Sequence, residues 1–405
     1  MKVYIVTREA FPYGMAAVQR IRSYAHAIQM GGLECEVVCF QRFQRENLNG
    51  GEPIPTRSVA DGIPYAYMGK TPVRHRNIFV RKFNDWLDTW ALLRYLERVL
   101  QQGDVVFFYG VDIHLSLLLG KLAHRHGAYV VRDLCELPYG TSAETRSAVR
   151  HRRQTLARQF PMLDGVVAIS DTLAELARTH CRPDCRIVKV PIMVDFDKYR
   201  LDDRSAEEAV PYIFHSGTLY EQKDGILGVF EAFGKACRQL DRPVRFVSTG
   251  SIASSPHSQA ILALIDKYGL GDKLTFTGYL SAEELRDRLS RASLVIINKK
   301  CTQQNHYCFS TKLGEYMAAA KPVIITRVGE AMNWLTDGVN AYIVEPEDTD
   351  VLAQAIVHAF SHPDEAKAIG QRGQEFCHDH FDYRAQSEAL CGFLRSLSSH
   401  NNDTI

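Results

Sequence analysis

The chain has 405 residues, of which 46% are hydrophobic and 23% are charged, and its net charge at pH 7 is +1. This length allows two ordinary domains with full hydrophobic cores, and the composition excludes a disordered protein. Residues 1–10 contain only a short apolar run, and no stretch has the roughly 18 apolar residues of a membrane-spanning helix. We therefore expect a cytoplasmic protein without a signal peptide.

The ten cysteines lack the spacing of a disulfide framework or a zinc site, so we expect free thiols. The charges are distributed unevenly. Residues 1–200 contain 28 lysines and arginines against 20 acidic residues, a balance of +8, whereas residues 201–405 contain 20 against 27, a balance of −7. The two halves therefore face different electrostatic partners, or each other. We expect no nucleic-acid partner.

Short β-rich runs alternate with helical patterns throughout the first half. The predicted strands cover residues 3–6, 37–40, 105–109, 129–132, 166–169 and 187–190. The predicted helices lie near residues 15–30, 83–102, 113–126, 143–159 and 171–180. This alternation predicts a parallel sheet covered by helices on both faces, which is a Rossmann-like domain.

The alternation stops in the charged residues 196–211 and then begins again. Strands are predicted at residues 212–215, 244–248, 274–277, 294–297, 323–326 and 341–344, with helices near 225–240, 257–268, 281–291, 312–320, 330–336 and 349–361. The second half is therefore a second Rossmann-like domain, 212–382, after a linker, 199–211. A terminal amphipathic helix is indicated by apolar residues at i, i+3, i+4 and i+7, namely Leu390, Phe393, Leu394 and Leu397.

Residues 309–326 predict a helix followed by a buried strand. Ser310 or Thr311 can cap the helix, Pro322 ends it, and its apolar positions lie on one face, namely Leu313, Tyr316, Met317 and Ala320. The start of a helix presents free N–H groups and a positive dipole end to a diphosphate. One turn later, the two carboxylate oxygens of Glu315 suit a ribose diol. The stretch therefore predicts a nucleotide-sugar site.

The sequence Ser-Thr-Lys-Leu-Gly-Glu-Tyr-Met-Ala-Ala-Ala-Lys-Pro-Val-Ile, at residues 310–324, resembles the donor-binding motif of the family-4 retaining glycosyltransferases, or glycosyl transferases group 1. That family has the GT-B fold, in which two Rossmann-like domains face each other across a cleft. The resemblance implies an acceptor domain at residues 1–198, joined by the last helix, 383–400, and a donor domain at 212–382. It covers residues 212–361 well and the first domain more loosely.

The resemblance also implies a set of donor-binding residues. Residues 215–225 are similar to the family's Gly-Arg-Leu-x-x-x-Lys-Gly loop, with Lys223 at the lysine and Thr218 in place of the arginine. Tyr307 stands where the family has the first of two glutamates, and Glu315 is the second. The implied donor-binding set is Gly14, Gly217, Thr218, Lys223, Gly250, Tyr279, Tyr307, Ser310, Thr311, Lys312, Leu313 and Glu315.

In the first domain, residues 129–138 lie where many members of the family carry a His-Asp pair near the reacting centre. Arg132 replaces the histidine, which leaves Asp133 and Glu136 as candidate acceptor contacts and, with Lys223, as candidate catalytic residues. A carboxylate there would orient an acceptor hydroxyl, and a salt bridge at the strand end is the alternative. Arg20 is similar to an arginine in the family's first helix, or it is simply exposed.

Other motifs carry less weight. Residues 195–197 and 348–350 each have the D-x-D spacing of a metal site, but the first follows the family's interdomain Pro-x-x-Val-Asp pattern, so we expect no metal. Dinucleotide-binding, Walker A, nucleophile-elbow and zinc-protease motifs are absent from the sequence. Dehydrogenase, ATPase, hydrolase and metalloprotease functions therefore lose their main support.

The resemblance implies a retaining, metal-independent transferase without a cofactor. It would move a sugar from a UDP- or GDP-linked donor to a hydroxyl of a saccharide, for cell-surface polysaccharide assembly. A sugar-nucleotide epimerase of the same fold, or a nucleotide-sugar-binding protein with little or no turnover, are the alternatives. Basic residues near Ile78, Phe79 and Val80, and others in residues 146–158, indicate peripheral contact with the inner face of an anionic membrane, and hence a lipid-linked acceptor.

Overall fold

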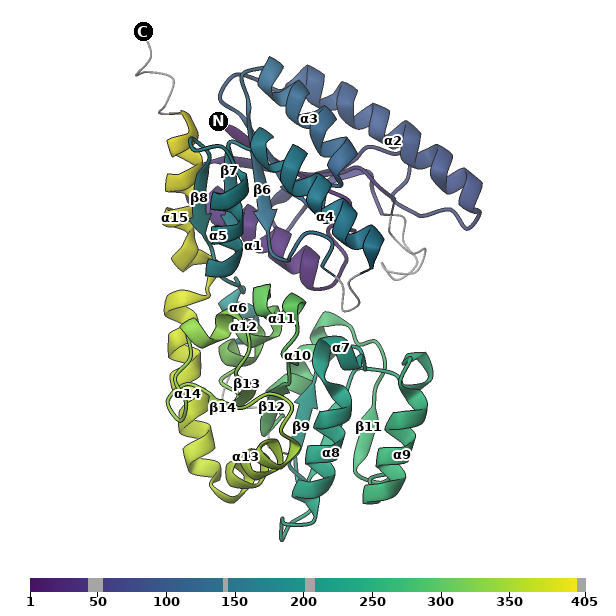
Figure 1. Ribbon diagram of the computed structural model, residues 1–405, viewed down its shortest axis with the longest axis vertical. Coiled ribbons are helices and arrows are strands. Elements are labelled where there is room, and N and C mark those ends of the chain that lie inside the picture. Colours follow the sequence, from purple (N-terminus) through teal and green to yellow (C-terminus); the bar gives the residue numbers. More distant parts are fainter. Residues whose placement is uncertain (43–53, 141–144, 201–207, 399–405) are drawn as a thin grey trace. The chain divides into compact units, whose positions relative to one another are not determined.

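The computed structural model describes residues 1–42, 54–140, 145–200 and 208–398 (Figure 1). The chain divides into two compact units. Unit 1 comprises Met1–Met193 and Tyr383–Ile405, and unit 2 comprises Val194–Asp382.

The described part of unit 1 contains an eight-stranded sheet in the order β3-β4-β2-β1-β5-β6-β7-β8. The strands are β1 (Lys2–Thr7), β2 (Glu34–Cys39), β3 (Arg57–Ala60), β4 (Ile63–Tyr67), β5 (Val105–Tyr109), β6 (Tyr129–Leu134), β7 (Gly165–Ala168) and β8 (Arg186–Lys189). Strand β3 pairs antiparallel with β4, and the other neighbours pair parallel. The predicted parallel sheet is therefore confirmed for this half.

Helices lie on both sides of this sheet. They are α1 (Ala16–Met30), α2 (Ile78–Val99), α3 (Ile113–Arg125), α4 (Arg146–Arg158), α5 (Asp171–His180) and α15 (Tyr383–Ser396), with a 3₁₀ turn, η1 (Phe160–Met162). Val3 and Ile5 on β1 share one apolar core with α1 and α15. Tyr4 points to the other side, where its hydroxyl donates a hydrogen bond to the carbonyl of Val99 at the end of α2. This alternation follows from the two-residue period of a strand.

The C-terminal helix α15 packs closely on the first helix. The Ser387 hydroxyl donates a hydrogen bond of 2.6 Å to the carbonyl of Ala27 in α1. A Cβ atom on Gly31, which follows α1, would lie 2.2 Å from the Cys391 sulfur. Only glycine allows the two helices to approach this closely, so the last helix is an integral part of unit 1.

Unit 2 contains a six-stranded parallel sheet in the order β11-β10-β9-β12-β13-β14. The strands are β9 (Tyr212–His215), β10 (Arg245–Ser248), β11 (Leu274–Phe276), β12 (Leu294–Ile297), β13 (Val323–Thr326) and β14 (Tyr342–Val344). The helices are α6 (Phe196–Tyr199), α7 (Glu221–Asp224), α8 (Ile226–Cys237), α9 (Ser258–Tyr268), α10 (Ala282–Ser290), α11 (Gln303–Tyr307), α12 (Thr311–Ala318), α13 (Thr349–Ser361) and α14 (Pro363–His380), with 3₁₀ turns η2 (Ile252–Ser254) and η3 (Glu330–Asn333).

The unit 2 sheet is also covered on both faces. Ile213, Ile296 and Ile324 belong to the core that includes α8 and α13, which lie side by side in Figure 1. Helix α12 packs on β12 and β13 and also on α14. Because all six strands run parallel, their carboxyl ends meet at one edge, where α/β domains bind their ligands. The second Rossmann-like domain is confirmed.

The sequence analysis missed the hairpin formed by β3 and β4. Its turn contains Asp61 and Gly62, whose φ angles are +49° and +76°. An Asp-Gly pair between two strand-like runs is the usual signal for such a turn, so the hairpin was detectable. Other differences concern helices: residues 363–376 of α14 were not predicted as a helix, and residues 330–336 form only a 3₁₀ turn, Glu330–Asn333. Helix α2 begins at Ile78, earlier than predicted, because the Asn77 side chain caps it.

The boundary between the units lies at Met193 and Val194, not at residue 198 as predicted. The Val194 N–H donates to the carbonyl of Phe381, and α6 packs on α12, so residues 194–198 belong to unit 2. Glu208, at the end of the predicted linker, forms ion pairs with two arginines of unit 2, Arg245 and Arg288. Most of that linker, 201–207, lies outside the described residues, as do residues 399 and 400 of the predicted last helix. Within the described ranges, no helix is both long and apolar enough to cross a membrane.

Candidate functional site

Three loops and one helix meet at the carboxyl edge of the unit 2 sheet. The N–H of Gly217, just after β9, donates a 2.8 Å hydrogen bond to the hydroxyl of Thr249, just after β10. The N–H of Ser216 donates to the hydroxyl of Tyr316 in α12. These bonds hold the loop after β9 against both neighbours, so residues far apart in the sequence form one surface.

A buried charge cluster lies at this edge. The Asp224 carboxylate, on a residue that is only 5% exposed, accepts from the ammonium groups of Lys312 at 3.2 Å and Lys299 at 3.3 Å. Lys299 also donates to the carbonyl of Lys223. Two positive charges therefore share one negative charge, and the cluster keeps an excess of positive charge.

The pKa shifts of the buried groups at this edge are consistent with an excess of positive charge. Burial raises the pKa of Asp224, but the nearby ammonium groups of Lys312 and Lys299 outweigh this effect and hold the pKa well below its usual value. Burial lowers the pKa of Lys312. Burial, and then the charge of Lys312, lower the pKa of His215 to about 3, so His215 is neutral at pH 7. The lysines are therefore the source of positive charge at this edge.

Two glycines allow close packing at this edge, Gly217 against Lys312 and Gly225 against Asn298. Gly217 has a φ of +148°, and a Cβ atom there would lie 2.6 Å from the Lys312 ammonium nitrogen. Gly225 has a φ of +54°, and its carbonyl accepts a 2.8 Å hydrogen bond from the Asn298 side chain. A larger residue at either position would be strained. The glycine-bounded loop predicted from the sequence is therefore a close fit around the charge cluster.

Helix α12 starts at this edge with open backbone donors. Ser310 is its N-cap residue, but the Ser310 side chain makes no capping hydrogen bond, and the first turn has no acidic residue. The first-turn N–H groups and the positive dipole end are thus available to an anion. Leu313, by contrast, is fully buried and its N–H donates to the carbonyl of Ser310. The Leu313 side chain therefore packs in the core, and donor binding by this residue stays a prediction that concerns its backbone.

Glu315 lies one turn further along α12, where it forms a hydrogen bond with the hydroxyl of Tyr199 on α6. Burial raises the pKa of Glu315 to about 7, although the bond from Tyr199 and the charge of Lys312 act in the opposite direction. The sequence analysis placed Tyr199 in a linker. Nothing in its local sequence marks it, because its role depends on how α6 packs on α12.

The remaining predicted donor residues of unit 2 lie in loops or short helices. Thr218 and Lys223 are exposed, and Tyr279, after β11, is 76% exposed. Gly250 follows β10, and a Cβ atom there would lie 2.5 Å from a side-chain carbon of Leu219. Tyr307 ends α11 and packs edge-on against the neighbouring His306 ring.

Lys299 and Asp224 were not predicted as site residues, although Lys299 follows the predicted strand 294–297 and Asp224 lies within the loop 215–225. Lys299 comes two residues after β12, which is a position where parallel sheets present ligand-binding groups. The next residue, Lys300, pairs with Glu221 of α7 at 3.0 Å. The signal that was available is therefore the Asn-Lys-Lys sequence at a carboxyl strand end.

The three predicted residues of unit 1 have different surroundings. Asp133 is 6% exposed and accepts bonds from Arg20 and from the hydroxyl of Tyr24. This geometry favours the strand-end salt bridge over an acceptor contact for Asp133. Glu136 is exposed beyond the end of β6. Gly14 precedes α1, and a Cβ atom there would lie 2.4 Å from a methyl carbon of Val18.

Both D-x-D sequences have local partners. Asp195 precedes α6 and pairs with Lys198 at 3.1 Å. Asp348 caps α13, and Asp350 pairs with Lys235 at 2.8 Å. These contacts give each sequence a structural role.

Among the described residues, one group brings three atoms of metal-ligand type within 4.8 Å of one another, and it consists of His358, His362 and Glu365. All three residues are exposed. They lie at the end of α13 and the start of α14, and helix α13 runs away from the carboxyl edge. This group is therefore not part of the site at that edge.

Residues 199–376 match the family model described as Glycosyl transferases group 1. The match covers the charge cluster, the start of α12 and Glu315. Among solved structures, sucrose-phosphate synthase from Thermosynechococcus elongatus superposes with a TM-score of 0.74 at 16% identity, covering 99% of this chain and 100% of that one. HepE from Anabaena, in complex with UDP-glucose, gives 0.72 at 14% identity, with 98% and 100% covered.

Two curated relatives are named as transferases. An α-D-kanosaminyltransferase of Streptomyces kanamyceticus is 23% identical over 201 residues, 50% of this chain, and the chain spans about half of that relative's length, 48%. A GDP-mannose-dependent α-(1-6)-phosphatidylinositol monomannoside mannosyltransferase of Mycolicibacterium smegmatis is 22% identical, covering 74% of this chain and 78% of the relative. The family match is thus to the group 1 glycosyltransferases over residues 199–376, and the chain has the GT-B fold.

Proposed function

We propose that this protein transfers a sugar from a UDP- or GDP-linked donor to a hydroxyl of a saccharide acceptor, with retention at the anomeric carbon. The observation that carries the proposal is the pair of lysines, Lys299 and Lys312, that share the single carboxylate of Asp224 at the carboxyl edge of unit 2. Their excess positive charge suits a diphosphate. A neutral or cationic ligand would gain nothing from it.

The donor would bind along α12. Lys312, Lys299 and the first-turn N–H groups at Ser310 and Thr311 would hold the diphosphate, and ionised Glu315 would accept two hydrogen bonds from the ribose diol. Gly217 and Gly250 would let the backbone approach the ligand. Thr218 and Lys223 border the same loop, while Tyr279 offers an exposed ring to the base and Tyr307 a hydroxyl to the sugar.

The chemistry needs little acid–base assistance in this scheme. The bond between the anomeric carbon and the phosphate oxygen breaks, and an acceptor oxygen forms a bond to the same face of that carbon. The leaving phosphate takes the acceptor's proton. Negative charge grows on the diphosphate during this step, and fixed positive groups aimed at it would provide the largest stabilisation. We propose that the lysines fill the role a metal ion has in other enzymes, so no cofactor is needed.

On the acceptor side, we assign different roles to the two carboxylates. Asp133 would maintain the fold through Arg20, since its carboxylate is buried and already paired. Glu136 is exposed and is the better candidate for an acceptor contact. Lys223 would assist the buried lysines from the rim of the loop.

We propose that the acceptor is lipid-linked and lies at the cytoplasmic face of an anionic membrane. Helix α2 supports this, because large aromatic side chains are exposed at i, i+4, i+7 and i+11, namely Phe79 (79%), Phe83 (59%), Trp86 (61%) and Trp90 (49%). Arg81, Lys82 and Arg94 lie on the same helix. An aromatic face with flanking basic residues is typical of a helix that lies in a membrane interface.

The relatives give the proposal a second line of support. One is named for a GDP-mannose donor and a phosphatidylinositol-based acceptor, and the HepE structure contains UDP-glucose. Neither name identifies the substrates of this chain. Cell-surface polysaccharide assembly is the process in which a lipid-linked saccharide acceptor would be expected.

The test is to incubate the protein with a panel of UDP- and GDP-sugars, with and without a membrane lipid extract, and to measure diphosphate release and sugar incorporation. We expect release of one nucleoside diphosphate that depends on the extract. Conversion of the donor to an isomeric nucleotide sugar would instead identify an epimerase. Tight nucleotide binding without turnover would identify a binding protein, and both results would contradict a transferase.

A further inference from the structure

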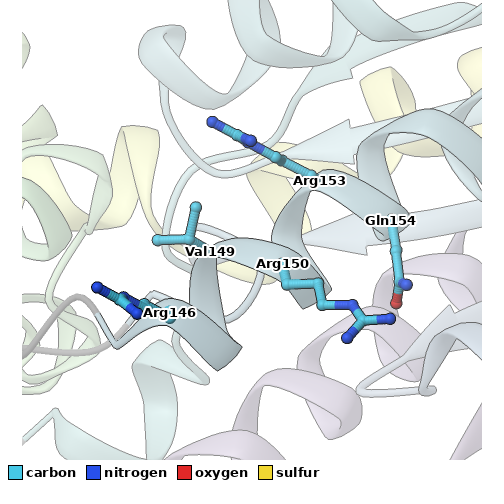
Figure 2. Close-up of a pocket in the computed structure, with 5 residues that line it drawn as sticks. All are labelled: Arg146, Val149, Arg150, Arg153 and Gln154. Atoms are coloured by element: carbon cyan, nitrogen blue, oxygen red, sulfur yellow. The ribbon is translucent and has the colours of Figure 1, made fainter.

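A second concentration of positive charge lies in unit 1, on helix α4. Arg146, Arg150 and Arg153 follow one another at i, i+4 and i+7, so they share one side of the helix. Together with Val149 and Gln154 they line a hollow of about 410 Å³. Figure 2 shows these five side chains, all from the same helix, with Val149 between the arginines. The opposite side of α4 is anchored by the buried residues Ala148 and Thr155.

The three arginines have no acidic partner among the described residues, whereas Arg42 in the same unit forms an ion pair at 2.7 Å. Helix α4 itself contains no aspartate or glutamate between Arg146 and Arg158. Like charges at i and i+4 repel each other and destabilise a helix. The charge of the hollow is therefore uncompensated within the described structure, and an anion bound there would relieve the repulsion.

The backbone adds to the positive potential at one end of the hollow. Arg146 is the first residue of α4, which is 13 residues long, and its first turn contains no acidic side chain. The preceding residue, Thr145, caps the N–H of Ala148. The helix starts after β6, on the chain that leaves the carboxyl edge of the unit 1 sheet. That edge is where ligands bind in α/β domains.

The guanidinium groups of the three arginines indicate which class of ligand fits the hollow. Each can donate two parallel hydrogen bonds to a phosphate, and several arginines on one face can bind different oxygens of the same group. Gln154 and Val149 are uncharged, and a hollow of about 410 Å³ has room for a group larger than one phosphate. A phosphate or diphosphate ester therefore fits this hollow better than a single carboxylate.

We propose that the hollow formed by Arg146, Val149, Arg150, Arg153 and Gln154 is a phosphate-binding subsite that holds the phosphate linking the saccharide acceptor to its lipid. Its identification as an acceptor subsite rests on the proposed function, but phosphate binding at the hollow does not. The subsite belongs to unit 1, whereas the lysines at Asp224 belong to unit 2. A lipid headgroup and a free phosphate ester share this chemistry, so the experiment distinguishes them.

The first measurement is calorimetric titration with inorganic pyrophosphate in a Lys312→Met background, which weakens binding at the unit 2 edge. The test variant is Arg146→Gln/Arg150→Gln/Arg153→Gln, and a control with the same loss of charge is Arg98→Gln/Lys121→Gln/Arg125→Gln on α2 and α3. We expect about 10-fold weaker binding in the test variant and less than a 2-fold change in the control. Equal losses in both variants, or no loss in either, would overturn the subsite.

Glutamine is a good helix former and removes the repulsion, so the test variant should fold, as circular dichroism can check. Arg150→Lys is the milder variant if it does not. This variant keeps the positive charge but loses the bidentate contact of the guanidinium group. Weaker pyrophosphate binding would support the subsite, and unchanged binding would argue against it.

The second measurement identifies the source of the phosphate. Vesicles of phosphatidylglycerol and of phosphatidylcholine are floated with the protein, with and without pyrophosphate. If pyrophosphate releases the protein from phosphatidylglycerol, the hollow binds headgroups of the membrane and the acceptor assignment is wrong. If flotation is unaffected while pyrophosphate still binds, the assignment to the acceptor is supported.

The third measurement separates this inference from the proposed function. In a transfer assay with lipid extract, the test variant should raise the KM for the acceptor about 10-fold and leave the KM for the donor unchanged. A matching rise in the donor KM would overturn the acceptor role. A wild-type protein without any transferase activity, but with pyrophosphate binding that depends on the arginines, would refute the proposed function and leave the phosphate subsite intact.

Discussion

Each unit buries a carboxylate beside positive groups, but the balance of charge differs between Asp133 in unit 1 and Asp224 in unit 2. In unit 1, Asp133 meets a single guanidinium, Arg20, whose other hydrogen bonds go to Tyr24 and to the carbonyl of Pro191. In unit 2, Asp224 is shared by two ammonium groups, Lys299 and Lys312. The first arrangement is neutral and closed. The second has a positive excess beside uncapped backbone donors, so it suits an anion.

This comparison shows that burial of an ionised residue does not by itself indicate a functional site. The side chains of Arg20 and Asp133 are 3% and 1% exposed, which is more buried than those of the lysines, at 12% and 21%. Paired charges that satisfy each other stabilise one conformation. Charges that remain uncompensated are the ones that can hold a ligand.

The largest effect should come from breaking the ion pair between Arg20 and Asp133. Asp133→Asn leaves Arg20 buried without its counter-charge, and we expect a loss of about 3–5 kcal/mol in the free energy of unfolding, measured by urea denaturation. Glu136→Gln, three residues along the chain and exposed, is the control, with a change within about 0.5 kcal/mol. A stable Asp133→Asn variant that has lost turnover would return Asp133 to the catalytic role that the sequence suggested.

Removing one of the shared lysines should cost activity rather than stability. Lys312→Ala still leaves Asp224 paired with Lys299, so the fold should persist, and turnover should fall on the order of 100-fold, about 2.7 kcal/mol of transition-state stabilisation. Steady-state kinetics of diphosphate release provide the measurement.

Two further lysine variants sharpen that result. Lys223→Ala should lower turnover by only about 10-fold, or about 1.4 kcal/mol, since its side chain is exposed. The matched control is Lys235→Ala on α8, which loses an ion pair to Asp350 of α13 and should be close to wild type. If Lys223→Ala is the more severe variant, the family motif predicts the catalytic lysine better than the charge cluster does.

Glu315 should make nucleotide binding depend on pH. Its pKa is raised to about 7, and the diol donates its hydrogen bonds to the ionised form, so affinity for the nucleoside diphosphate should increase as the pH rises from 6 to 8. Glu315→Gln should bind about 10-fold more weakly at pH 8, a loss of about 1.4 kcal/mol, and show no such increase. Calorimetric titration at several pH values decides this, and an equally pH-dependent variant would exclude Glu315.

The same shift has a consequence for stability without ligand. Glu315 has a pKa of about 7 in the folded protein, whereas the ordinary pKa of a glutamate, which applies to the unfolded chain, is 4.5. This group's contribution to stability is therefore complete below pH 4.5 and is lost as the pH rises through 7. Bound nucleotide should reverse that loss, which thermal unfolding with and without ligand can measure.

The smallest effect should come from chelation. Lysine ammonium groups replace a metal in the proposed mechanism, and both D-x-D sequences have structural partners. Treatment with EDTA at on the order of 5 mM should therefore leave turnover within about 2-fold of its initial value. Loss of activity that manganese or magnesium restores would contradict the assignment of the diphosphate charge to Lys299 and Lys312.

Much of the site was predictable because its parts are local in the sequence. Helix α12 and strand β13 are identified by a capping residue, an apolar helix face, Pro322 and a short strand in that order. The family motif assigns Glu315 to the donor-binding residues. Glycines 217 and 225 were expected in a turn, and their positive φ angles agree. The hairpin at Asp61 was missed although its Asp-Gly turn was visible, so that error was one of interpretation.

The sequence by itself determined the alternation of strands and helices, the two Rossmann-like units and the helix that starts the proposed nucleotide-sugar site, since these follow from short-range periodicity and capping. Only the tertiary structure decided which charges meet. Lys299 and Lys312 reach Asp224 across 75 and 88 residues, and Arg20 reaches Asp133 across 113. No local pattern encodes such pairs, because they arise where parallel strands bring distant loops to one edge, and burial there makes the balance of charge decisive.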